Sequence, residues 1–102
     1  MDFGLENETI KRIQEVFGQF PEISEVLLYG SRAMGNFKPG SDIDITIKIS
    51  RPNLDMMNSI SMQLDNLMLP YLFDLSFYSH IQNKDLLTHI GRVGKVLYQK
   101  VN

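Results

Sequence analysis

Hydrophobic and polar residues alternate from Asp42 to Ile49, and this period of two predicts a β-strand with one buried face. The isoleucines at every second position share that face. Aspartate is uncommon in strands, so the two aspartates on the opposite face are unusual for a strand. The opposite face carries Asp42, Asp44, Thr46 and Lys48.

Three further segments have strand-like patterns. Residues 25–29 contain the run VLLY, which is apolar on both faces and predicts a covered strand inside a sheet. In residues 71–78 the odd positions are hydrophobic and are expected to face the core, so Asp74 and Ser76 should point to the other side. Residues 95–100 predict a short final strand at the sheet edge.

Hydrophobic residues at helical spacing predict longer helices between these strands. The first is expected after Asn7 or Thr9, either of which can cap it, and it should end near Gly18. The second is expected to start at Pro52 and close at Pro70. Its inner face should comprise Leu54, Met57, Ile60, Ser61, Leu64 and Met68.

Two more helices are expected beside the strands. Asn83 should cap a third longer helix that continues through Ile90 and is broken at Gly91. Ser31 should cap a short helix over Arg32–Gly35. The pattern predicts an α/β (α+β) fold in which a small mixed sheet has its helices on one face and an acidic site on the other.

Composition narrows the class of protein. A length of 102 residues suggests one domain, 1–102. The net charge of −2 lacks the basic footprint of a duplex nucleic-acid binder. There are no cysteines, which excludes disulfides and thiolate chemistry. No signal peptide or membrane span is recognisable, so we expect a cytoplasmic protein that does not bind membranes.

The candidate chemistry centres on a glycine turn and two carboxylates. Asp42 and Asp44 should project from one strand face about 7 Å apart, and a divalent cation would offset their repulsion. Gly30 and Ser31 follow the preceding strand, where backbone N–H groups could bind phosphate. Together these features suggest metal-assisted phosphoryl or nucleotidyl transfer. The alternative is an ordinary solvated strand face, since acidic outer faces are common.

The arrangement G-S-x10-D-x-D, from Gly30 to Asp44 with apolar residues around it, resembles the signature of the DNA polymerase beta-type nucleotidyltransferases. The likeness is greatest to the minimal nucleotidyltransferases, which are of about this length. The third family carboxylate has a match at Asp74, between Phe73 and Leu75. The resemblance implies the nucleotidyltransferase fold and transfer of a nucleoside monophosphate, with AMP from ATP favoured.

The same resemblance implies roles for individual residues. Asp42, Asp44 and Asp74 would be catalytic and would hold Mg²⁺ or Mn²⁺. Gly30 and Ser31 would bind the nucleotide phosphates. Arg32 is a candidate for the same task. Lys38 is a second loop cation that could steer the polyphosphate, although loop cations are usually solvated. The only histidines, His80 and His89, are expected at the surface or at helix ends rather than as ligands.

Minimal nucleotidyltransferases pair with HEPN-domain proteins, and in such toxin–antitoxin pairs they can transfer AMP to a tyrosine of the partner. The resemblance therefore implies an antitoxin whose site is completed by a HEPN-type protein, by a second copy in a homodimer, or by both. Two alternatives stay open. One is an antitoxin that binds nucleotide or metal without turnover, and the other is an enzyme that modifies a small molecule such as an antibiotic.

Overall fold

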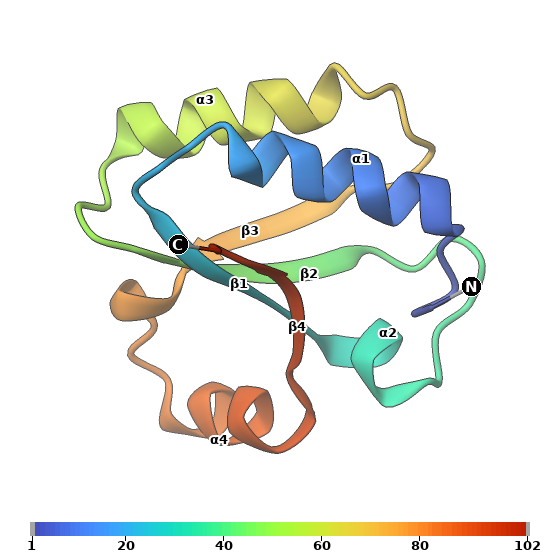
Figure 1. The fold of residues 1–102 in the computed structure, drawn as a ribbon. Coiled ribbons are helices and arrows are strands. Elements are labelled where there is room, and N and C mark those ends of the chain that lie inside the picture. Colours follow the sequence, from blue (N-terminus) through green and yellow to red (C-terminus); the bar gives the residue numbers. More distant parts are fainter. Residues whose placement is uncertain (1, 102) are drawn as a thin grey trace.

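A mixed four-stranded sheet forms the centre of the protein, in a computed structural model that describes residues 2–101 (Figure 1). The strand order is β3-β2-β1-β4. β1 pairs antiparallel with β2 and β4, whereas β2 and β3 are parallel. The strands are β1 (Ile23–Tyr29), β2 (Ile43–Ile49), β3 (Phe73–Phe77) and β4 (Lys95–Gln99). The expected mixed sheet is confirmed, with β1 inside it and β4 at one edge.

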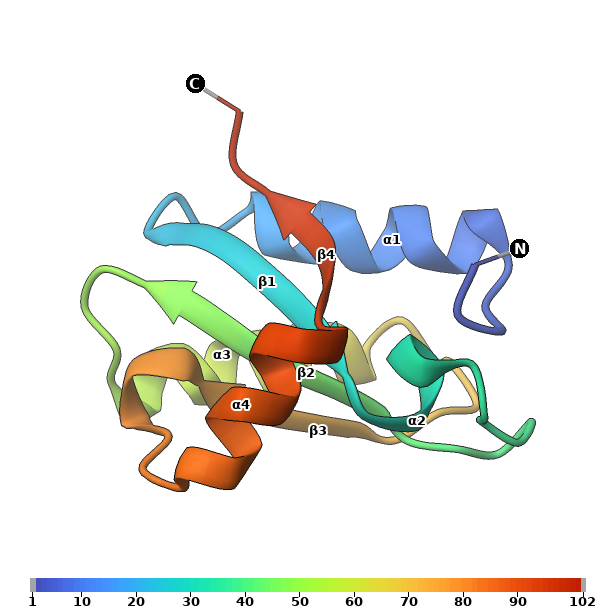
Figure 2. The same cartoon turned by 90° about the horizontal axis from the view of Figure 1, so that it is seen from below.

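Helices cover both faces of this sheet. α1 (Asn7–Gly18) and α3 (Leu54–Asp65) lie side by side on one face. α4 (Lys84–Val93) lies across the opposite face (Figure 2). The sequence pattern predicted helices on the first face only. The position of α4 matters because it brings a helix to the face that carries the acidic residues.

The hydrophobic core lies between the sheet and the α1–α3 layer. The alternating isoleucines of β2 and the odd positions of β3 point into it, as their period of two predicts. α1 and α3 contribute the other side. The buried core residues are Leu5, Ile13, Val16, Phe17, Ile23, Val26, Leu28, Ile43, Ile45, Ile47, Ile60, Leu64, Phe77 and Leu97.

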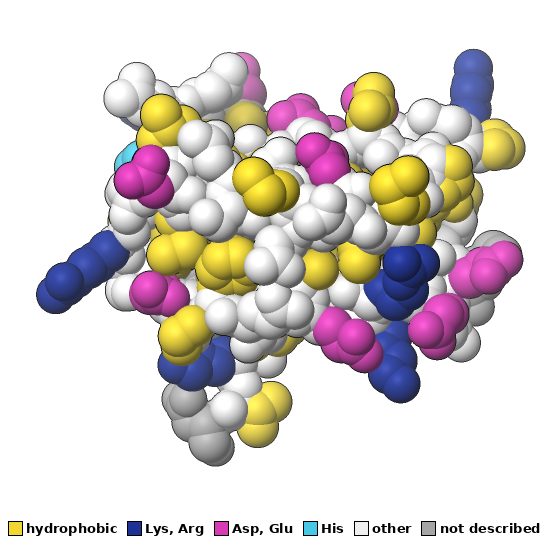
Figure 3. Space-filling view, turned by 90° about the horizontal axis from the view of Figure 1, so that it is seen from above, with side chains coloured by type: hydrophobic (Ala, Val, Ile, Leu, Met, Phe, Trp, Pro, Cys, Tyr) yellow, Lys and Arg dark blue, Asp and Glu magenta, His cyan; other side chains and the backbone are white. Residues whose placement is uncertain are grey.

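The second predicted helix is shorter than expected. α3 starts after Asn53, whose side chain accepts a hydrogen bond from the Met56 N–H, and it ends at Asp65 rather than Pro70. Two residues assigned to its inner face are outside, since Leu54 is 72% and Met68 85% exposed. Hydrophobic side chains therefore occur on the outer face of the α1–α3 layer, mixed with polar ones (Figure 3).

The short helix also begins earlier than expected. α2 (Gly30–Met34) includes Ser31, so Ser31 does not cap it. Tyr29 occupies the cap position without a side-chain cap bond. Asn83 caps α4 as predicted by accepting bonds from two backbone N–H groups, but Gly91 lies inside that helix. Across residues 2–101, every helix falls short of the length and hydrophobicity that crossing a membrane requires.

Candidate active site

Strand register brings residues from three strands into one row on the α4 side of the sheet. Asp44 of β2 lies opposite Asp74 of β3 and, on its other side, opposite Tyr29 of β1. Directly opposite residues on neighbouring strands have their side chains on the same face. Asp42 immediately precedes β2 and is exposed, as is Asp74. The two carboxylates that are 30 residues apart in sequence therefore meet across a parallel strand pair.

The second row reinforces this pairing. The Ser76 hydroxyl of β3 donates a hydrogen bond to Oγ1 of Thr46 on β2, over 3.0 Å. Thr46 is fully buried, so this bond satisfies a buried polar group. The bond joins β2 and β3 one row beyond Asp44 and Asp74 and supports their register.

Asp44 is the carboxylate most affected by its surroundings. Burial raises its pKa above the ordinary value, and the charges of Asp74 and Asp42 raise it further. His89 opposes this effect. The carboxylates of Asp42 and Asp74 thus add charge repulsion to the effect of burial at this end of β2. A bound cation would relieve that repulsion.

The donor set suits a hard divalent ion in kind, because carboxylate oxygens are the ligands that Mg²⁺ and Mn²⁺ prefer. Asp42, Asp44 and Asp74 supply such oxygens from adjacent backbone positions. Within residues 2–101, however, no group of three or more His, Cys, Asp or Glu side chains is arranged so that it could hold a metal ion. The backbone register therefore pairs Asp44 with Asp74, while the side chains are not gathered into a closed metal cage.

Gly30 adjoins this acidic row. Its φ of +75° lies in the region that favours glycine, and a Cβ at this position would overlap Oδ2 of Asp44. A side chain would therefore both strain the backbone and displace the carboxylate. The Gly30 N–H donates a hydrogen bond to Nε2 of His89 over 3.1 Å. Ser31 follows at the start of α2 and is partly exposed.

Arg32 does not behave as the loop cation that the sequence suggested. Its side chain is only 2% exposed, and its guanidinium donates to the backbone carbonyls of Phe3, Pro39 and Ser41. The guanidinium carbon also lies 5.2 Å from the Phe37 ring centre and 4.9 Å from that of Tyr71. These contacts favour a structural role for Arg32, whereas Lys38 is exposed in the loop before β2.

Two residues at the site went unnoticed in the sequence. Tyr29 appeared to be part of a covered strand, yet its ring is in edge-to-face contact with His89 and in the row of Asp44. Burial raises the pKa of Tyr29, the Ser76 hydroxyl lowers it in part, and the charges of Asp74 and Asp44 raise it again. His89 was expected at the surface or at a helix end. No local pattern could have placed it here, because its position depends on how α4 packs.

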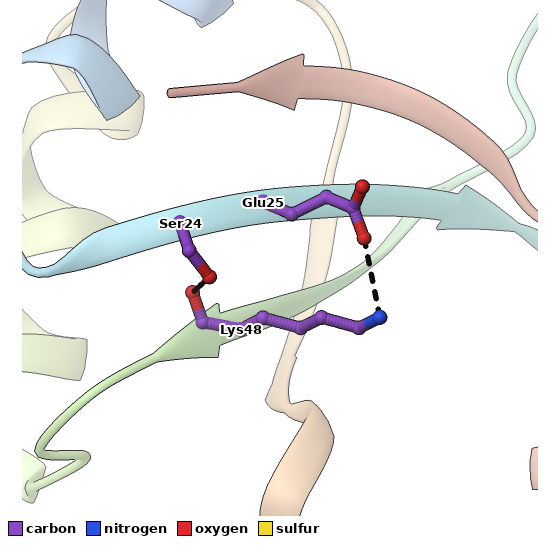
Figure 4. A network of polar contacts seen from close by, with 3 residues as sticks. All are labelled: Ser24, Glu25 and Lys48. Carbon is purple, nitrogen blue, oxygen red and sulfur yellow. Dashed lines mark hydrogen bonds and ion pairs between the residues drawn. The ribbon is translucent and has the colours of Figure 1, made fainter. Parts of the chain in front are cut away.

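The far end of the same sheet face carries a separate set of polar contacts (Figure 4). Lys48 of β2 forms an ion pair with Glu25 of β1 over 3.1 Å, and its backbone carbonyl accepts a bond from Ser24. The Lys48 ammonium also lies 4.7 Å from the centre of the Tyr78 ring. Because these partners already engage Lys48, it is not directed toward the acidic row.

Sheet topology, the paired carboxylates and the glycine turn define a nucleotidyltransferase-type domain. The sequence matches the family model "Polymerase beta, Nucleotidyltransferase" over residues 11–102. The chain therefore belongs to this family, and the expected resemblance is confirmed. Comparison with curated protein sequences gave no match.

Solved structures share the fold. A toxin–antitoxin crystal structure with AMP-PNP aligns with a TM-score of 0.73 and 19% identity, covering 89% of this chain and 73% of the other. The complex of a tri-AMPylated Shewanella oneidensis HEPN toxin with an MNT antitoxin aligns with a TM-score of 0.69 and 16% identity, covering 94% of this chain and 74% of the other. A nucleotidyltransferase structure from Sulfolobus solfataricus aligns with a TM-score of 0.58 and 21% identity, covering 89% of this chain and 77% of the other. At these identities the likeness concerns the fold.

Proposed function

We propose that this protein is a metal-dependent nucleotidyltransferase that moves AMP from ATP to a hydroxyl group of a HEPN-type partner, as the antitoxin of a toxin–antitoxin pair. The observation that carries the proposal is the pairing of Asp44 with Asp74 beside the Gly30 turn, in a chain of the polymerase beta family. The family alone supports nucleotidyl transfer. The similarity to toxin–antitoxin structures supports the choice of partner.

The proposal gives roles to the glycine turn and to the three carboxylates. The backbone N–H groups of Gly30 and Ser31 bind phosphate oxygens. Asp42, Asp44 and Asp74 would hold Mg²⁺ or Mn²⁺, which when bound supplies positive charge to neutralise the triphosphate. A cation bound there would offset the repulsion from Asp74 and Asp42, which adds to burial in raising the pKa of Asp44.

Asp74 is exposed at the sheet edge and can therefore meet an incoming acceptor. In the proposed reaction it orients the acceptor hydroxyl and accepts its proton. The hydroxyl oxygen forms a bond to the α-phosphorus, and the bond to the bridging oxygen breaks to release pyrophosphate. Positioning of the two reactants accounts for much of the expected acceleration.

Incubation of the purified chain with the product of its neighbouring gene, each labelled NTP and Mg²⁺ tests the proposal directly, and we expect that product to be a HEPN-type protein. We expect label on the HEPN-type protein with ATP and none when either protein is omitted. Label on a small molecule in the absence of the partner would contradict the choice of acceptor. Failure to label any acceptor would contradict the proposed reaction.

One observation favours a second candidate function. Among the described residues, the three carboxylates are not arranged to hold a metal ion. An antitoxin that acts by complex formation alone does not need such an arrangement. A tight complex with the HEPN-type protein, in which every NTP fails to label the partner, would select this binding-only function.

A further inference from the structure

The Gly30 amide, which the proposed function assigns to phosphate, has a partner within the protein. Its N–H donates to Nε2 of His89 on α4 over 3.1 Å. Nε2 uses its lone pair to accept this bond. The N–H donor that lies beside Asp44 is therefore already occupied by a side chain.

The surroundings of His89 hold the imidazole over Gly30. Its ring contacts Tyr29 edge to face, with ring centres 6.2 Å apart and an angle of 83° between the ring planes. α4 packs on β1 and α2 (Figure 2). The contacts of His89 with Tyr29 and Gly30 place it over the junction between these two residues. His89 is only partly buried. Its ring can therefore leave Gly30 without burying an unpaired nitrogen, which would be costly.

We propose that His89 is an affinity-determining residue of the nucleotide site: its imidazole occupies the Gly30 amide, and a triphosphate must displace it to bind. This inference rests on the proposed function, which places phosphate at Gly30. One N–H cannot make a well-aligned hydrogen bond to both Nε2 and a phosphate oxygen. Nucleotide binding therefore replaces Nε2 of His89 with a phosphate oxygen as the acceptor for the Gly30 N–H, and the stabilisation from the bond to His89 is lost.

Calorimetric binding of AMP-PNP with Mg²⁺ to wild type and His89 variants measures this cost. His89→Ala should bind about 2- to 10-fold more tightly, because the competing hydrogen bond is gone. His89→Gln retains an acceptor oxygen and should stay within about two-fold of wild type. Thr88→Ala alters the exposed neighbour on the same helix and should change nothing. Melting curves identify any variant that fails to fold.

The Gly30 amide proton provides a second readout that does not depend on nucleotide. In ¹⁵N-resolved NMR spectra its resonance should shift in His89→Ala but not in Thr88→Ala. Addition of AMP-PNP with Mg²⁺ to wild type should shift the Nε2 resonance of His89 as the bond to Gly30 breaks. An unshifted Nε2 resonance in a nucleotide-bound protein would overturn the proposal.

The outcomes separate this inference from the proposed function. Equal affinity in wild type and His89→Ala, or weaker binding in the variant, would overturn the displacement by showing that His89 is neutral or contacts the nucleotide. Failure of wild type and every variant to bind any nucleotide would remove the proposed function, and the inference with it.

Discussion

At the scale of single residues, Asp44 combines a functional position with an unfavourable charge. Its carboxylate lies opposite Asp74 and close to Asp42, and its pKa is raised by burial and by both charges. A carboxyl group with a raised folded-state pKa costs no stability while it is protonated in both states. The cost develops as the pH rises from the unfolded pKa through the folded pKa, and it persists above that.

Asp44→Asn should therefore stabilise the protein at neutral pH in the presence of EDTA. Removal of a half-buried charge and its repulsion predicts a rise in Tm of about 2–4 °C. This gain should shrink as the pH falls through the raised pKa of Asp44 and vanish below the ordinary pKa of an aspartate. Addition of Mg²⁺ or Mn²⁺ should raise the Tm of wild type but not of the variant, since a ligand stabilises only the state that binds it.

Glu15→Gln provides the control for Asp44→Asn, because Glu15 is exposed on α1, and α1 lies on the opposite face of the sheet from α4 and the acidic row. Its Tm should stay close to that of wild type, with the metal response intact. An equal metal response in Asp44→Asn would show that the ion binds elsewhere.

Gly30 offers a second test at this scale. Gly30→Ala should lower stability by about 1–2 kcal/mol, because φ is +75°, and should also displace the Asp44 carboxylate. Gly35 is a matched control: its φ is +86°, but a Cβ there meets nothing within 4 Å. Both variants should show similar losses of Tm, while only Gly30→Ala should lose nucleotide affinity in calorimetry. Equal nucleotide affinity in the two variants would make the Gly30 turn purely structural.

At the scale of elements, the loop between α2 and β2 is organised by one buried cation. Arg32 donates to carbonyl groups of Phe3, Pro39 and Ser41 and lies between two aromatic rings. The N-terminal segment, α2 and the approach to β2 are thereby held together. Asp42 follows directly after this loop, so the loop also determines where the acidic row begins.

Arg32→Ala should destabilise the protein by about 3 kcal/mol or more, because it leaves several carbonyl groups without a charged donor. The expected fall in Tm is about 12–24 °C for a chain of this size. Arg32→Lys should recover only part of the loss, since an ammonium cannot reproduce the planar fork. Lys38→Ala, in the same loop but exposed, should melt within a few degrees of wild type.

Thermal melts of these three variants decide between the two roles of Arg32. If Arg32→Ala melts like wild type but binds nucleotide more weakly, the role of Arg32 is phosphate binding, as the sequence suggested.

At the scale of the whole molecule, the proposed site is open on the side where a partner could approach. Asp74 is exposed on the edge strand β3, and the neighbouring Leu72 is 74% exposed. Single exposed hydrophobic residues are common, so this edge does not by itself identify a partner, and the HEPN-type partner is part of the proposed function.

Asp74→Asn should abolish labelling of the HEPN-type partner but leave the complex largely intact, because the change removes a charge and little contact area. Co-purification and transfer of label from ATP measure the two effects separately. Leu72→Ala serves as the converse control and should weaken the complex if this edge forms the interface. Loss of the complex in Asp74→Asn would mean that the carboxylate binds the partner.

Much of the fold follows from patterns within single elements. The period of two in β2 and β3 determines which side chains enter the core, and the Asn83 cap determines where α4 starts. The spacing from Gly30 to Asp44 indicates the family, because glycine and carboxylates are needed at those backbone positions whatever the surroundings. These features are local, so the linear sequence is sufficient to determine them.

Tertiary structure alone decided how separate elements meet. The side-by-side placement of Asp44 and Asp74 requires a parallel strand pair joined through α3, and the contact of His89 with Gly30 requires α4 on the opposite face. The burial of Arg32 depends in part on residues far from it in sequence, because Phe3 supplies a carbonyl group and Tyr71 a ring. Such contacts depend on packing between distant segments, which hydrophobic periodicity does not encode.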